Sequence, residues 1–123
     1  MNKTGRLPRM KVPLFDSGDV IFCNSIEAWK ALHNQLRADG GNGLTNGASH
    51  TISSGAGTLH IIGVFNGKAS TLAHECSHIA FDICGIVGVP VSPGEANETF
   101  CYLISRLVDF GSKHMQKPAI NAG

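Results

Sequence analysis

This sequence of 123 residues has almost no imbalance between the two signs of charge. Ten Lys and Arg residues stand against nine Asp and Glu residues, which gives a formal net charge of +1. A protein that binds nucleic acid or an anionic membrane surface through its overall charge carries a clear excess of basic residues. We therefore expect neither nucleic acid nor membrane as a partner.

Long apolar runs are also missing. No stretch approaches the 18 or more consecutive apolar residues of a membrane span. The first ten residues hold Lys3, Arg6 and Arg9, but no apolar segment follows them as it does in a secretion signal. We therefore expect a cytoplasmic protein.

The sequence has four cysteines but no Cys-x-x-Cys pair. Each cysteine stands among apolar neighbours: Cys23, Cys76, Cys84 and Cys101. We expect them to be small buried hydrophobic residues in a reducing compartment, with zinc ligation and disulfides as the alternatives.

The length and the 42% hydrophobic content fit a single domain. We expect a flexible leader at 1–10, one domain at 11–110 and a flexible tail at 111–123. The pattern predicts an α+β fold with a small, mainly antiparallel sheet and about three helices. The expected elements are a hairpin of 11–15 and 20–23, a helix from Asn24 to about Asp39, a loop over 40–57 with a weak strand near 51–53, a strand over 58–65, a helix from Ser70 or Thr71 to Gly85, and a helix from Ser92 to about Phe110.

The motif His-Glu-x-x-His, at residues 74–78, lies within one of these expected helices. Residues four apart on a helix share one face, so His74 and His78 can bind a single ion. Glu75 is offset by about 100° around the helix, which lets its carboxylate deprotonate a metal-bound water as a general base. The motif predicts a zinc site that performs metal-assisted hydrolysis.

The motif helix carries an apolar stripe at i, i+4, i+7 and i+11, formed by Leu72, Cys76, Ile79 and Ile83. Such a stripe predicts a helix that lies largely in the interior. Two structural histidines on a core helix are the alternative to metal binding.

Two histidines do not complete a catalytic zinc site, which has three protein ligands and an open position. The candidates for the third ligand are Glu95 and Glu98. The segment 92–95 reads as a helix start in which Glu95 reaches back to the Ser92 N–H, so we favour Glu98 and keep Glu95 as the alternative. Tyr102 follows Glu98 by four residues and is expected either to orient that carboxylate or stabilise an oxyanion, or to pack as a half-buried residue.

The stretch from Thr58 to Leu107 resembles the gluzincins, zinc metallopeptidases in which a glutamate on the helix after His-Glu-x-x-His completes the site. More narrowly, residues 71–78 and 97–103 look like small phage-encoded metallopeptidase-like proteins. The resemblance implies a minimal zincin-like domain, Zn²⁺ as the cofactor and a peptide or protein substrate. For a phage-encoded protein, the compartment would be the bacterial host cytoplasm.

Two further side chains near the expected site have two interpretations each. His60 either occupies one face of the strand 58–65 or hydrogen-bonds beside the cleft and assists an oxyanion. Asp82 follows His78 by four residues and is either solvated or a hydrogen-bond acceptor for a ligand imidazole.

We expect peptide-bond hydrolysis, with an extended peptide paired to the edge of the strand 58–65. One alternative is a non-catalytic, zinc-stabilised phage protein that binds a host protein. Another is a zinc hydrolase with a different substrate. The sequence leaves the oligomeric state open.

Overall fold

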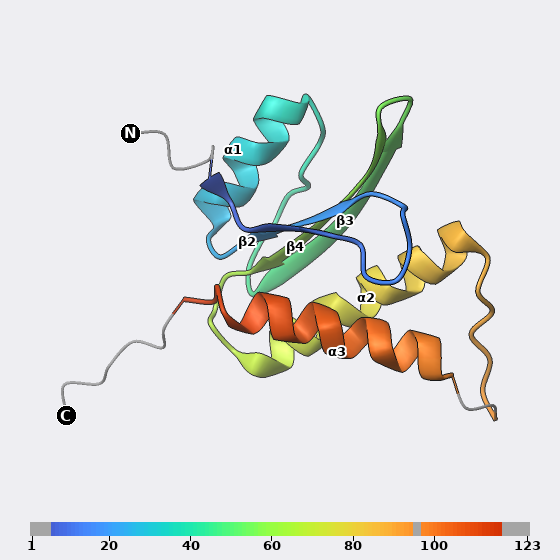
Figure 1. Ribbon diagram of the computed structural model, residues 1–123. Helices are drawn as coiled ribbons and strands as arrows, with labels where there is room; N and C mark the ends of the chain where they lie inside the picture. Colours follow the sequence, from blue (N-terminus) through green and yellow to red (C-terminus); the bar gives the residue numbers. More distant parts are fainter. Residues whose placement is uncertain (1–5, 95–96, 117–123) are drawn as a thin grey trace, which may run out of the picture.

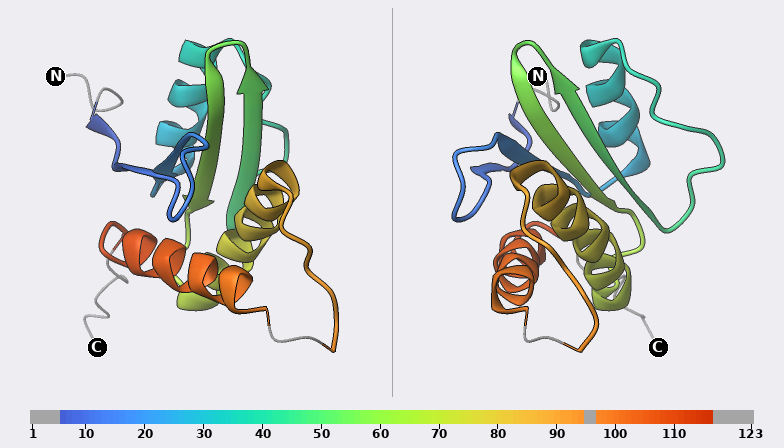
Figure 2. Two further views of the ribbon diagram at one scale, coloured as in Figure 1. Left: turned by 45° about the vertical axis from the view of Figure 1, so that its right-hand side comes forward. Right: turned by 90° about the vertical axis from the view of Figure 1, so that its right-hand side faces the viewer.

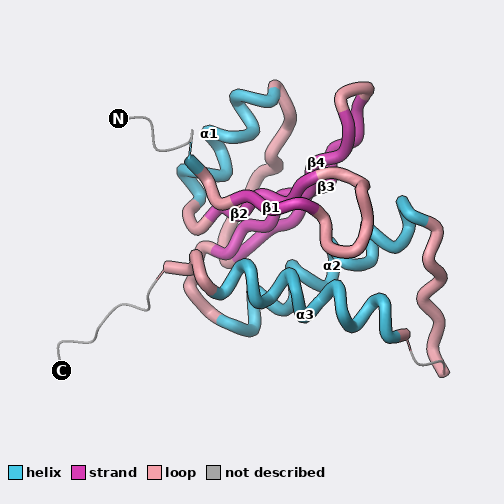
Figure 3. The backbone as a smooth tube through the Cα atoms, viewed as in Figure 1, coloured by secondary structure: helices cyan, strands magenta, loops and turns pink. Residues whose placement is uncertain are grey.

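The computed structural model describes residues 6–94 and 97–116. One four-stranded sheet lies between helix α1 on one face and helices α2 and α3 on the other (Figures 1 and 2). The elements in chain order are β1 (Arg9–Lys11), β2 (Asp19–Cys23), α1 (Ile26–Leu36), β3 (Gly47–Ser54), β4 (Gly57–Val64), α2 (Ala69–Val87) and α3 (Glu98–Ser112) (Figure 3). The expected α+β class is confirmed.

The strand order is β1-β2-β4-β3. β1 and β2 form an antiparallel hairpin, and β3 and β4 form another. β2 and β4 pair in parallel, because α1 and β3 lie between them in the chain and carry it back to the same end of the sheet. The sheet is therefore mixed, with two antiparallel pairings and one parallel pairing among the described residues.

The larger core lies between the sheet and helices α2 and α3. The four residues of the predicted apolar stripe on α2 are all buried, as expected, and they pack with Val20, Phe22, Ile62, Val64, Leu103 and Leu107. On the other face of the sheet, Trp29 and Leu32 of α1 pack on Ile21, Cys23 and Ile61. Both faces of β2 and β4 are thus covered, which explains why their sequences are almost continuously apolar.

The segment expected to be a loop at 40–57 contains β3, an eight-residue strand. β3 has few large apolar residues because it is an edge strand, and it is held by backbone pairing with β4 along its whole length. The predicted strand 58–65 corresponds to β4, which lies between β2 and β3 and has no free edge. The expectation that a peptide could pair with that strand is therefore wrong. On that side of the sheet, the free edge is formed by the neighbouring strand β3.

Helix boundaries differ from the expected ones because other side chains provide the caps. The Ser25 hydroxyl, and not Asn24, accepts a hydrogen bond from the Ala28 N–H at the start of α1. α2 begins at Ala69, where the Asn66 side chain accepts from the Lys68 N–H and donates to the Thr71 hydroxyl.

The predicted start of the last helix at Ser92 is wrong. Gly94 has a φ of +86°, a left-handed conformation that a helix start does not use, and α3 begins at Glu98 after Asn97 at the N-cap position. The capping argument that assigned Glu95 a structural role, and so favoured Glu98 as a ligand, therefore has no support. Glu95 itself lies outside the described residues.

The ordered domain extends beyond the expected limits at both ends. β1 begins at Arg9, within the segment expected to be a leader, and Arg9 forms an ion pair with Asp19 at 2.7 Å. After α3, the Gln116 side chain donates to the Asn24 carbonyl at 2.7 Å, and the Asn24 side chain donates to the His114 carbonyl.

Within the described part of the chain, none of the helices combines the length and the apolar character that crossing a bilayer requires.

Substituting Gly111 tests the contact between α2 and α3. A Cβ atom at Gly111 would lie 2.6 Å from Leu72 Cδ1 and 3.4 Å from Phe22 Cε1, whereas one at Gly85 of α2 would meet no atom within 4 Å. We expect Gly111→Val to lower the free energy of unfolding by about 1–3 kcal/mol through overpacking, and Gly85→Val to leave it unchanged or slightly raised. Urea denaturation of both variants measures the difference, and equal stabilities would contradict this packing.

Candidate functional site

The histidines of the motif lie on the outer side of α2. Since the apolar stripe faces the sheet and α3, His74 and His78 project away from the core, and both are exposed. Their Nε2 atoms are 3.2 Å apart, and their rings meet edge to face. Two nitrogen ligands of a tetrahedral zinc ion, each about 2.0–2.1 Å from the metal, are about 3.3 Å apart. The pair fits a shared ion.

Glu75 lies on the side of α2 that faces β3. Its side chain is only 8% exposed, and no described residue forms a hydrogen bond with its carboxylate. Gly47 of β3 makes room for it, because a Cβ atom at Gly47 would lie 2.6 Å from Thr71 Cγ2 and 3.3 Å from Glu75 Cγ. The absence of a side chain at Gly47 therefore lets the edge strand approach the motif helix closely.

Glu75 and His74 both line a polar cavity of ≈ 400 Å³ between β3 and the first half of α2. Its other lining residues are Thr45, Asn46, Gly47, Ser70 and Thr71. A second cavity of ≈ 520 Å³ lies between β3 and the second half of α2. Figure 2 shows β3 and α2 running side by side in the same general direction. The two cavities share no lining residue and lie one after the other between these elements, and we call the pair of cavities the groove.

The structure brings His60, Thr51 and Asp82 together in a hydrogen-bonded chain beside this groove. The Thr51 hydroxyl donates to Asp82 Oδ2 at 2.8 Å and accepts from His60 Nδ1 at 2.7 Å, since a hydroxyl has one proton to donate. His60 is fully buried, and its Nε2 has no partner among the described residues. The described hydrogen bonds of Asp82 include the one from Thr51 and none from His78.

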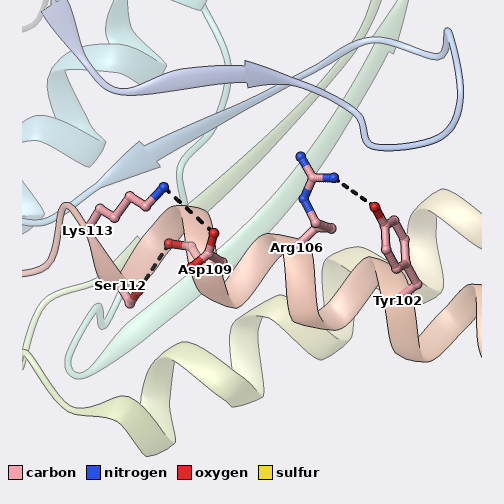
Figure 4. A network of polar contacts seen from close by, with 5 residues as sticks. All are labelled: Tyr102, Arg106, Asp109, Ser112 and Lys113. Atoms are coloured by element: carbon pink, nitrogen blue, oxygen red, sulfur yellow. Dashed lines mark hydrogen bonds and ion pairs between the residues drawn. The ribbon is translucent and has the colours of Figure 1, made fainter.

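Glu98 and Tyr102 lie elsewhere. Both are exposed and line a shallow cavity with Leu14 and Thr99, and the Tyr102 hydroxyl accepts a hydrogen bond from Arg106 along the outer face of α3 (Figure 4). On the side of α3 that meets α2, the ring of Phe100 packs on Phe81 with 4.6 Å between ring centroids.

The expected three-ligand group of His74, His78 and Glu98 is thus not assembled in this structure. In 6–94 and 97–116, no three His, Cys, Asp or Glu side chains gather in a group that could hold a metal ion. The spacing of the two histidines matches that of two zinc ligands, and among the described residues no third His, Cys, Asp or Glu side chain joins them in this structure.

None of the four cysteines belongs to a group of three potential metal ligands among the described residues. Burial raises the pKa of the Cys76 thiol to about 12, with the nearby Glu75 carboxylate adding to the shift, and burial raises the pKa of Cys23 to about 12. Because the thiolate is the reactive form, neither thiol is a ready nucleophile. All four cysteines are free, and Cys101 is exposed, contrary to the expectation.

A second histidine pair joins α1 to β3. His33 Nδ1 donates to the Trp29 carbonyl at 2.8 Å, which leaves its Nε2 to accept from His50 Nδ1 at 3.0 Å. Burial lowers the pKa of His50, and the neighbouring His33 lowers it further. This pair holds α1 on the sheet and lies on the opposite face from the motif helix.

Comparison with protein-family models, curated proteins and solved structures gives no match to this chain. The candidate function therefore depends on the site itself. The sequence did not point to Gly47 and Thr51 as part of it, although the alternation of small polar residues with Ala48, His50 and Ile52 is a weak strand signal.

The buried His60 predicts a loss of stability in acid. Burial lowers the pKa of His60 from 6.5, and Asp82 only partly offsets this. The unfolded chain therefore takes up a proton below pH 6.5 that the folded protein does not, so stability falls as the pH drops through that value. Protonation of this one group can lower the free energy of unfolding by up to about 1.4 kcal/mol per pH unit. Urea unfolding of the parent and of His60→Asn between pH 7.5 and 5 measures how the free energy of unfolding depends on pH. An identical pH dependence in the two proteins would contradict the prediction.

Proposed function

We propose that this protein is a zinc-dependent peptidase whose metal is held by His74 and His78 and whose proton-transfer group is Glu75. The observation that carries the proposal is the 3.2 Å separation of the two Nε2 atoms on one exposed face of α2, with Glu75 turned toward the groove beneath β3. When bound, zinc supplies Lewis acidity toward the peptide carbonyl and toward water.

The surroundings of Glu75 suit a general base. Its carboxylate lines a polar cavity, where it can accept a proton from the attacking water. The close approach of β3 at Gly47 limits the conformations of this side chain and excludes bulk water from one side of it. The same carboxylate can then pass the proton to the leaving amine.

The edge of β3 suits an extended peptide. Among the described strands β3 pairs only with β4, so the N–H and C=O groups of its other edge are free to form a β-ladder with a substrate. Residues of β3 line both cavities, so a peptide paired to its free edge would pass His74 and Glu75 at the first cavity and Asp82 at the second.

The alternative of zinc used only for folding receives less support. A structural zinc site is closed by four protein ligands, whereas the described residues contribute two histidines on an exposed helix face. The core of α2 is already filled by apolar contacts with the sheet and α3, so this helix does not depend on a metal ion to bury its stripe.

Substitutions within the motif test the proposal. We expect Glu75→Gln to keep about one zinc per chain but to lower peptide hydrolysis at least about a hundredfold, because it removes the base and keeps the ligands. His78→Ala should lose both metal and hydrolysis. Elemental analysis and cleavage of a peptide mixture measure the two effects, with Glu27→Gln on the exposed face of α1 as the control. Unchanged turnover in Glu75→Gln would refute the mechanism.

A second pair of variants identifies the third ligand. Because Glu98 lines a cavity on the far side of α3 with Leu14, we expect Glu98→Gln to leave zinc affinity unchanged. Glu95→Gln, at the remaining sequence candidate, is expected to weaken zinc by more than about tenfold, as loss of a ligand or its support does. Competition titration with a chromophoric chelator measures both. If Glu98→Gln instead lowers the zinc affinity, then α3 shifts toward the histidines when zinc binds.

A further inference from the structure

The part of the groove beside the second half of α2 has no role in the proposed hydrolysis. This cavity of ≈ 520 Å³ begins one helical turn past His78 and borders the free edge of β3. Its lining residues are Ser49, His50, Thr51, Phe81, Asp82, Gly85 and Ile86. It combines one carboxylate with two large apolar side chains.

The carboxylate in this cavity is exposed and is oriented by one hydrogen bond. Asp82 Oδ2 accepts from the Thr51 hydroxyl at 2.8 Å, and that hydroxyl is itself held by the fully buried ring of His60. The described contacts use only Oδ2, so Oδ1 is free to accept from a ligand. A positioned acceptor loses little conformational entropy when it binds a partner.

The charge of Asp82 is not neutralised by the described part of the protein. The ion pairs there are Arg9 with Asp19 and Lys113 with Asp109, and neither involves Asp82. A carboxylate that lines a cavity without a cation is complementary to a basic group of a ligand.

Two exposed apolar side chains flank Asp82. Phe81 is 53% exposed and Ile86 is 47% exposed, and both line the same cavity. Lys and Arg combine an aliphatic stem, which packs on apolar surface, with a charged head that pairs with a carboxylate. The face of Phe81 also attracts a cation. A Lys or Arg side chain can therefore pair with Asp82 while its stem packs on Phe81 and Ile86.

The position of Asp82 relates this cavity to the proposed hydrolysis. Along α2, Asp82 is six residues past the midpoint of the two histidines, which is about 9 Å of helix. An extended peptide covers this distance in two to three residues at about 3.3 Å each. Thr51 marks the same level on β3, because its hydroxyl contacts Asp82.

We propose that this cavity is a specificity subsite for a Lys or Arg side chain, located two or three residues from the hydrolysed bond of a peptide paired to β3. The proposal rests on the proposed peptidase function, which it extends from peptides in general to peptides with a basic residue at a fixed distance from the cleavage site.

A synthetic decapeptide library with randomised positions tests the subsite on the zinc-loaded protein, with cleavage sites identified by mass spectrometry. We expect Lys and Arg to be enriched about tenfold or more at one position, two or three residues from the cleaved bond. Asp82→Asn, which can still accept from Thr51, should abolish the enrichment, and Asp82→Arg should replace it with Asp and Glu. Asp109→Asn, an exposed carboxylate on α3, is the matched control and should keep it.

A binding measurement separates the subsite from the peptidase. Fluorescence anisotropy of a fluorescein-labelled Ala-rich decapeptide with one central Lys, compared with its Glu counterpart, is measured on Glu75→Gln with and without Asp82→Asn. Cleavage without a basic preference would overturn the subsite and leave the peptidase intact. Absence of cleavage with Asp82-dependent Lys binding would overturn the peptidase and the subsite's role in cleavage, and would leave a binding site for a basic side chain at Asp82. Neither cleavage nor Lys-selective binding would overturn both.

Discussion

Burial of the apolar stripe of α2 is the contact on which the rest of the structure depends. Each fully buried Leu or Ile side chain stabilises the fold by about 1.5–3 kcal/mol, so a stripe of this kind leaves little freedom for the helix to rotate. Because Leu72, Ile79 and Ile83 have to face the sheet and α3, His74 and His78 have to face outward. A paired, exposed arrangement of imidazoles follows from core packing alone.

The same packing gives Glu75 a different environment from its two histidine neighbours. It lies at the border of the stripe, where β3 comes close enough for Gly47 to contact the helix. The two imidazoles are exposed, whereas the Glu75 carboxylate between strand and helix is only 8% exposed, so the three motif side chains have unequal environments.

The chain from His60 through Thr51 to Asp82 links the interior to the surface of the groove. His60 sits in the central strand β4, Thr51 in the edge strand and Asp82 on the motif helix. Polar groups inside a core are costly unless they are hydrogen-bonded, and here one nitrogen of His60 finds no described partner. Its two hydrogen bonds run from the buried His60 to the exposed Asp82 and fix the position of Thr51 on β3 relative to α2.

By itself, the sequence determined the class of the fold, the buried stripe, the central strand β4 and the face that the two histidines share, because each depends on local periodicity. Only the tertiary structure decided that β3 is an edge strand beside the motif helix, since β3 owes its conformation to pairing with β4 and has little apolar pattern of its own. It also decided the position of Glu98, which is the first residue of α3 and lines a cavity with Leu14, Thr99 and Tyr102 and without either motif histidine. Motif spacing fixes neighbours on one helix, whereas the distance between two helices depends on how their side chains pack.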